Sequence, residues 1–164
     1  MIHRQNGQDK MVSQAEWDSW TCANTASNGH LEILKWAAQA EKTVLQAKWD
    51  SQTCNDAAYN GHLDVLKWAR ENGCDWNVST CSSAASNGHL DVLKWARDNG
   101  CDWNILTSSY AAQNGHLEVL KWAVQNVCSL HSSLCFYAFK NGKHEILKWI
   151  KDNGCVCGGE YHKD

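Results

Sequence analysis

The chain has 164 residues, of which 15 are basic and 18 are acidic, so its formal net charge is -3. It contains no run of Lys or Arg, which argues against nucleic acid as a partner, and no stretch of 18 apolar residues, which argues against a membrane span. The polar first ten residues lack the apolar core of a secretory signal. We therefore expect an intracellular, cytoplasmic protein whose nine cysteines are reduced thiols.

One segment, Asn-Gly-His-Leu-Glu-Ile-Leu-Lys-Trp-Ala, recurs along the chain with small changes. The five copies begin at Asn28, Asn60, Asn87, Asn114 and Asn141. Their spacings of 32, 27, 27 and 27 residues give a 27-residue unit with one five-residue insertion. Units of this size stack on one another, because each is too small to bury its apolar face alone. The sequence therefore predicts one solenoid.

In chain order, a tail and cap precede the repeats, and a second tail follows them. The expected boundaries are 1–16 for the N-terminal tail and cap, 17–48, 49–75, 76–102, 103–129 and 130–156 for the repeats, and 157–164 for the C-terminal tail. Ser13-Gln-Ala-Glu16 has the capping-box pattern of a helix start. For the insertion we expect a loop from about Glu41; a longer helix, or a turn capped by Thr43 and Gln46, are the alternatives.

Each unit has the pattern of two short helices, as the third repeat illustrates. Residues 79–86 offer hydroxyl side chains suited to an N-cap and then small residues, and Gly88 ends this first helix. Apolar residues recur from Leu90 to Ala96 at spacings of three and four, which indicates a second helix closed by Gly100.

The second helices also place an acidic residue three positions before a lysine, a spacing typical of ion pairs on a solvated face. The pairs are Glu32/Lys35, Asp64/Lys67, Asp91/Lys94, Glu118/Lys121 and Glu145/Lys148. The fifth unit differs from the others, with Lys143-His144 in place of His-Leu. We interpret it as a C-terminal cap, because terminal repeats present a polar outer side.

The segment from Ala84 to Lys94, with the following Asn99-Gly-Cys-Asp-Trp-Asn104, resembles the ankyrin repeat. It has the family's Ala-Ala, Gly-His-Leu-Glu-Val-Val and Gly-Ala-Asp-Val-Asn elements in order. The family's unit has 33 residues, and the six absent here fall between Asn104 and Leu106, where ankyrin repeats form a β-hairpin. The resemblance implies an all-α solenoid of five helix-turn-helix repeats with the hairpins reduced or absent. Such shortened units are similar to those of large DNA viruses of protists, which implies host-cell cytoplasm.

Trp76 and Trp103 stand where the ankyrin family has the smaller Val. We expect these rings to fill the space that the missing hairpins leave; an exposed aromatic binding ladder is the alternative. The histidines of the repeated Gly-His pair are expected to be structural, because they are spread along the stack and do not converge with a nucleophile. They are His30, His62, His89 and His116. We therefore predict no catalytic residues, no cofactor and no enzymatic activity.

The cysteines follow the repeat in two series. Cys74, Cys101, Cys128 and Cys155 form one series, and Cys22, Cys54, Cys81 and Cys135 form the other. Equivalent residues in stacked helices lie about 8–10 Å apart, too far for disulfides along the first series, and the second series is expected to pack as small apolar side chains. The strongest metal candidate is Cys155 and Cys157 with His162, and Cys128 is the candidate for a fourth ligand. Because zinc ligand pairs favour wider spacings, we predict no metal site.

Positions that differ between the units mark the expected binding surface. In ankyrin-like stacks the first helices line the concave face, and Tyr and Trp are enriched at interaction hot spots. The expected partner-binding residues are Trp20, Tyr59, Tyr110, Gln113, Tyr137 and Lys140. The sequence thus predicts a monomeric protein–protein interaction scaffold whose partner is another protein. The alternatives are a small Cys/His metal-binding or redox module and a structural protein that self-associates.

Overall fold

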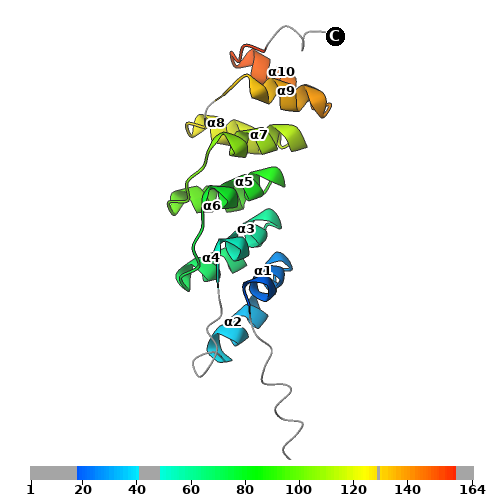
Figure 1. Cartoon of the computed structure of the whole chain (residues 1–164). Coiled ribbons are helices and arrows are strands. Elements are labelled where there is room, and N and C mark those ends of the chain that lie inside the picture. The colour runs from blue at the N-terminus through cyan, green and yellow to red at the C-terminus, as the bar shows by residue number, and fades with distance from the viewer. Residues whose placement is uncertain (1–17, 41–48, 129, 158–164) are drawn as a thin grey trace, which may run out of the picture.

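The computed structural model describes residues 18–40, 49–128 and 130–157, and every regular element in them is an α-helix. The helices are α1 (Ser19–Ser27), α2 (Leu31–Ala40), α3 (Ser51–Tyr59), α4 (Leu63–Glu71), α5 (Val78–Ser86), α6 (Leu90–Asp98), α7 (Ile105–Asn114), α8 (Leu117–Gln125), α9 (Ser133–Lys140) and α10 (His144–Asp152). They stack as five pairs along one axis (Figure 1). No strand occurs in the described ranges, which confirms the expected all-α solenoid of helix-turn-helix repeats without hairpins.

Two local expectations concern residues outside these ranges. The capping box at 13–16 precedes the first described residue. Helix α2 ends at Ala40, and the loop or turn expected at 41–48 lies in the segment that the structure leaves undescribed.

The first helix of each of the first four pairs begins at an Asp or Asn side chain. In the third repeat, Oδ1 of Asn77 accepts the N–H of Ser79 at 2.8 Å, so α5 begins at Val78. Asp18, Asp50 and Asn104 cap α1, α3 and α7 in the same way. The expected hydroxyl cap within 79–86 is therefore wrong. Asp, Asn and Ser cap helices about equally well, so composition alone does not choose among neighbouring candidates.

A glycine follows the first helix of each pair, and in the first three pairs a histidine of the next repeat packs against it. Gly88 has a φ of 78°, and a Cβ added there would lie 2.5 Å from Nδ1 of His116. The same ring donates from Nε2 to the main-chain oxygen of Ser86 at 3.0 Å. This oxygen belongs to the last turn of α5, where carbonyls lack partners within the helix.

The histidine contact recurs along the stack. His62 binds the carbonyl of Ser27 and His89 binds that of Tyr59, both at 3.1 Å. In the fifth repeat Lys143 takes this position, and its side chain lies beside Gly115. At these three sites the histidines connect neighbouring repeats, which agrees with the structural role expected for them.

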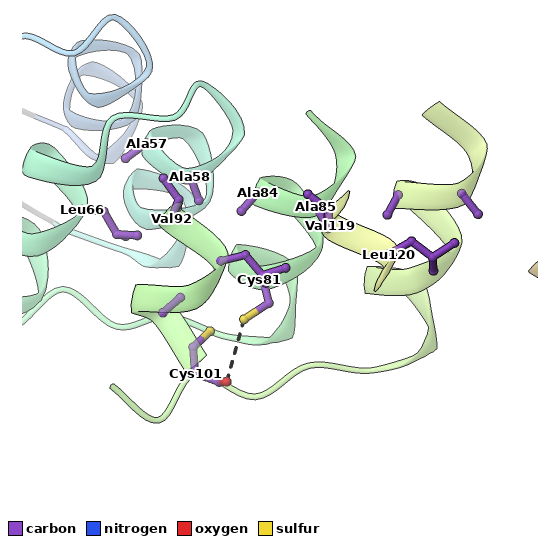
Figure 2. Close-up of a cluster of buried hydrophobic side chains, with 14 of the residues drawn as sticks. Ala57, Ala58, Leu66, Cys81, Ala84, Ala85, Val92, Cys101, Val119 and Leu120 are labelled. Atoms are coloured by element: carbon purple, nitrogen blue, oxygen red, sulfur yellow. Dashed lines mark hydrogen bonds between the residues drawn. The ribbon is translucent and has the colours of Figure 1, made fainter. Parts of the chain in front are cut away.

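Small side chains form the buried centre of the stack. Ala57, Ala58, Ala84 and Ala85 are fully buried between successive first helices, while residues such as Leu66 and Val92 enter from the second helices (Figure 2). Alanine lets neighbouring helix axes approach closely, because it adds one methyl group to the backbone surface. The stack is therefore held together by helix-to-helix contact within and between pairs.

The tryptophans expected to replace the hairpin layer are packed on both sides. The Trp76 ring meets the Trp95 ring edge-on, with centroids 5.7 Å apart, and the Arg70 guanidinium of the preceding repeat lies 4.2 Å from its centroid. Trp103 repeats the arrangement with Trp122 and Arg97. Both rings are only half-buried, but each bridges two repeats. The rings therefore cover the edge of the core and do not form an exposed ladder.

Only two of the five expected ion pairs occur in the described structure. Glu32 pairs with Lys35 and Glu118 with Lys121, both at 2.8 Å. Lys67 and Lys94 instead extend toward the tryptophan of the following repeat, with Nζ 5.9 and 6.0 Å from the ring centroids. A cation above an aromatic face is attracted by the ring quadrupole. The charged residues of the second helices thus contribute to contacts between repeats.

Candidate protein-binding face

The first helices α1, α3, α5, α7 and α9 contact one another in order along the stack. Their alanine and cysteine sides are buried, and their opposite sides reach solvent. We use the name first-helix face for this exposed side. It contains the positions at which the repeats differ most, and all six residues predicted to bind a partner belong to its helices.

The six predicted residues differ in exposure. The exposed fractions are 72% for Trp20, 49% for Tyr59 and 36% for Tyr110. Lys140, at the end of α9, is also exposed, while Gln113 and Tyr137 are half-buried. The aromatic side chains predicted for recognition therefore offer accessible surface in the first, second and fourth repeats.

A hollow of about 410 Å³ lies between α1 and α3, and Trp20 forms part of its wall. The lining residues are Ser19, Trp20, Ala23, Asn24, Ser27, Asp50, Gln52 and Asp56. We refer to it as the Trp20 hollow. Of the six predicted residues, only Trp20 lines it.

The Trp20 hollow has an acidic wall. Oδ1 of Asp56 accepts a hydrogen bond from Nε2 of Gln52 at 2.6 Å, and Oδ1 of Asp50 accepts the N–H groups that begin α3. Burial raises the pKa of the Asp56 carboxyl, the hydrogen bond from Gln52 opposes this effect, and the nearby charge of Asp50 adds to it. No basic residue lines the hollow. A positive group entering it would therefore meet two carboxylates and an aromatic ring.

The middle and the far end of the first-helix face differ from this hollow. Helix α5 presents only serines there, at Ser79, Ser83 and Ser86. On α9, Phe136 lies 5.5 Å from the Tyr137 ring and 5.5 Å from Nζ of Lys140. The structure thus brings Tyr137 and Lys140 together around Phe136, a residue that the sequence analysis missed because inner repeats have no aromatic residue at that position.

Within a repeat, a cysteine of one series lies close to a cysteine of the other. One expectation about the cysteines is wrong. Cys135 forms a disulfide with Cys157, whereas all nine cysteines were expected to be reduced and Cys135 to pack as a small apolar side chain. The sulfurs of Cys54 and Cys74 lie 3.0 Å apart, and Sγ of Cys81 lies 3.8 Å from the main-chain oxygen of Cys101 (Figure 2). The sequence analysis compared cysteines 27 residues apart, whereas the Cys54/Cys74 and Cys81/Cys101 contacts join the two series and Cys157 belongs to neither series.

The described residues form neither a cluster of metal ligands nor a membrane-spanning helix. Across the described ranges, no three His, Cys, Asp or Glu side chains are grouped as metal ligands. Cys157 of the metal candidate is used by the disulfide, and His162 lies outside the described residues. None of the described helices has both the length and the apolar character that crossing a membrane requires.

Comparison with known proteins agrees with this architecture. The family model of ankyrin repeats in many copies matches residues 54–96 and 81–124. No curated protein matches the chain. Among solved structures, the ankyrin repeat domain of human ASB11 is similar, with a TM-score of 0.67 at 16% sequence identity over 82% of this chain and 69% of that chain. Such low identity shows the fold alone. Residues 54–124 are therefore ankyrin repeats, and the stack that contains them has the ankyrin-repeat fold.

Proposed function

We propose that this chain is a non-enzymatic scaffold that binds another protein along the first-helix face. One observation carries the proposal: Trp20, Tyr59 and Tyr110 leave much of their aromatic surface exposed on the face where the repeats differ. Tyr and Trp dominate interaction hot spots, because they bury a large area and lose little rotamer freedom.

The residues that recur from repeat to repeat support a non-catalytic role. The histidines, which have the chemistry of a general base, are used elsewhere, since His62, His89 and His116 bind main-chain oxygens at helix ends. Catalysis needs a nucleophile, a base and an orienting group in one place, and the stack instead distributes equivalent groups along its length. This arrangement favours recognition over a broad surface.

The Trp20 hollow suggests the chemistry of one anchor of the partner. A Lys or Arg side chain inserted there would lie near the Trp20 ring and within reach of the carboxylates of Asp50 and Asp56. Cation–π attraction and a charged hydrogen bond favour such a group. We therefore propose that the segment of the partner facing the first two repeats is basic. The resemblance of the short units to those of viruses of protists makes a host-cell protein the first partner to seek.

The binding face can be tested with substitutions that the repeats themselves suggest. The third repeat has Ser86 and Ser83 where other repeats have Tyr59 and Tyr110, so a Tyr59→Ser, Tyr110→Ser double variant keeps side chains that this frame accommodates. In affinity capture from the native cell with quantitative mass spectrometry, we expect it to lose partners that the parent chain retains. Losing two hot-spot residues weakens binding at least about tenfold.

A matched control lies on the other side of the stack. Lys94 is exposed on α6, a second helix, and Lys94→Ser should retain every partner of the parent. If the double tyrosine variant also retains every partner, the choice of face is wrong. Self-association, the remaining alternative, predicts a mass above that of a monomer in size-exclusion chromatography with light scattering.

A further inference from the structure

Three cysteines lie close together at the C-terminal end of the stack, and we call them the C-terminal cysteine cluster: Cys135, Cys155 and Cys157. Cys135 on α9 is bonded to Cys157, and the Sγ of Cys155, a free thiol, lies 4.0 Å from the Sγ of Cys135. Val156 between the other two is 85% exposed. Alternate residues of an extended segment point the same way, so Cys155 and Cys157 both turn toward α9. Cys135 therefore has two sulfur neighbours and is bonded to one.

The inner repeats show that the unused pairing fits the frame. Cys135 and Cys155 are 20 residues apart, as are Cys54 and Cys74, and the sulfurs of the latter pair approach to 3.0 Å. Position 157 does not continue a cysteine series, because the equivalent residues in the inner repeats are Trp76 and Trp103. The Cys135–Cys155 pairing is thus the one that the repeat geometry favours, and the Cys157 pairing is particular to the fifth repeat.

The three sulfurs also differ in access from solvent. Cys135 is fully buried and Cys157 is only 7% exposed, whereas Cys155 is half-buried. Exchange with a disulfide requires a thiolate to reach one of its sulfur atoms. A thiol in solution reaches Cys155 more readily than either sulfur of the existing disulfide.

We propose that the C-terminal cysteine cluster is a thiol–disulfide exchange site that takes small-molecule thiols through Cys155. The Cys155 thiolate attacks Sγ of Cys135, the Cys135–Cys157 bond breaks, and Cys157 leaves as a thiolate that takes up a proton. The new Cys135–Cys155 disulfide has its more exposed sulfur at Cys155. A small-molecule thiolate attacks there and releases Cys135 as a thiol, and a second one releases Cys155 and forms a small-molecule disulfide. The two electrons come from the two external thiols.

Exchange would change the end of the stack. Opening the bond to Cys157 frees the segment that follows α10 from α9. Helix α9 also carries Tyr137 and Lys140 of the first-helix face, so the redox state of the cluster would act on the same helix. The exchange chemistry itself does not depend on the proposed binding function.

The test uses the oxidised full-length chain with excess reduced glutathione at about pH 8.5, since thiolates are the attacking species and burial raises the pKa of the Cys155 thiol. Samples are trapped with N-ethylmaleimide, and tandem mass spectrometry locates the label among the three cysteines. We expect Cys155→Ser to slow loss of the disulfide about tenfold or more. The equivalent substitution one repeat earlier, Cys128→Ser, should leave the rate unchanged.

A second variant tests the alternative pairing directly. In a mixture of reduced and oxidised glutathione, Cys157→Ser should form a Cys135–Cys155 disulfide, because the competing partner is absent. Circular dichroism confirms that each variant retains its helices. Equal reduction rates for the parent and Cys155→Ser, or a folded Cys157→Ser chain in which Cys135 and Cys155 both stay unlinked to each other, would overturn the proposal.

Discussion

Single buried residues at equivalent positions have different environments in different repeats. Thr53 and Thr80 occupy the same position and are both fully buried. Oγ1 of Thr80 donates to Oδ1 of Asn55 on the preceding first helix at 2.7 Å. For Thr53, the residue equivalent to Asn55 in the preceding repeat is Ala23, which has no side-chain acceptor. Oγ1 of Thr53 has no hydrogen-bond partner in the described part of the chain. The energetic role of one threonine therefore depends on its neighbour.

We expect Thr53→Val and Thr80→Val to have opposite effects on the free energy of unfolding. Burying a hydroxyl without a partner costs about 1–3 kcal/mol, whereas a satisfied hydrogen bond contributes about 1 kcal/mol. Thr53→Val should therefore be neutral or stabilising, and Thr80→Val should destabilise by about 1 kcal/mol. Urea denaturation followed by circular dichroism measures both. Equal destabilisation by the two would show that the hydrogen bond to Asn55 contributes nothing.

The glycines of the repeat also differ in what surrounds them. Gly88 and Gly100 have similar φ values, 78° and 82°, but a Cβ on Gly88 would meet the His116 ring while a Cβ on Gly100 would meet nothing within 4 Å. Gly100→Ala should cost about 1–2 kcal/mol for its left-handed backbone. Gly88→Ala should cost at least about 1 kcal/mol more, because it also displaces His116 from its hydrogen bond. Indistinguishable urea midpoints for the two variants would contradict this account.

At the scale of helices, the tryptophans cover the edge of the core that hairpins would otherwise cover. Trp76 lies between Arg70 of one repeat and Trp95 of the next. Edge-to-face aromatic pairs and cation–π contacts each contribute about 0.5–1.5 kcal/mol beyond the buried area. The ring therefore connects two second helices that would otherwise share little surface.

Trp76→Val should consequently destabilise the stack by about 2 kcal/mol, the combined effect of both ring contacts and part of the buried area. Trp20→Val provides the control, since this ring is mostly exposed, and exposed substitutions usually change stability by less than about 0.5 kcal/mol. Thermal and urea denaturation test the pair. A loss at Trp76 no larger than that at Trp20 would show that Trp76 does not connect the repeats.

The sequence was sufficient for the helices themselves but not for all their ends. Glycine stops and the apolar stripe from Leu90 to Ala96 depend on local backbone and periodicity, and α6 (Leu90–Asp98) follows them. The start of α5 was misplaced, because Asn77 and the hydroxyl residues after it are all competent N-caps. Which of these residues forms the N-cap depends on where the chain lies as it leaves the preceding repeat.

At the scale of the whole molecule, charge is distributed unevenly along the first-helix face. The Trp20 hollow contains Asp50 and Asp56, whereas Lys140 lies at the other end of the face. The proposal of a basic anchor at the first end has a simple chemical probe. Nα-acetylarginine amide carries the guanidinium that the hollow should accept, and Nα-acetylcitrulline amide has nearly the same shape and no charge.

Titration with Nα-acetylarginine amide should shift the indole N–H resonance of Trp20, identified by comparison with Trp20→Phe, and Nα-acetylcitrulline amide should shift it much less. Asp56→Asn should raise the dissociation constant roughly two- to fivefold, because an exposed charge pair contributes about 0.5–1 kcal/mol. Added salt should weaken the binding of the parent chain. An equal response to both amides would mean that charge does not govern the hollow.

The sequence by itself determined the unit length and the two helices of each unit, because both follow from periodicity and local backbone preference, and the resemblance to the longer ankyrin repeat implied that the hairpins are reduced or absent. Only the tertiary structure decided that Cys135 bonds to Cys157, that Asp56 and Trp20 line one hollow, and that Lys67 extends toward the next repeat's Trp95. Periodicity compares equivalent positions in different repeats. These contacts join unlike positions, so they depend on how neighbouring helices are placed in space.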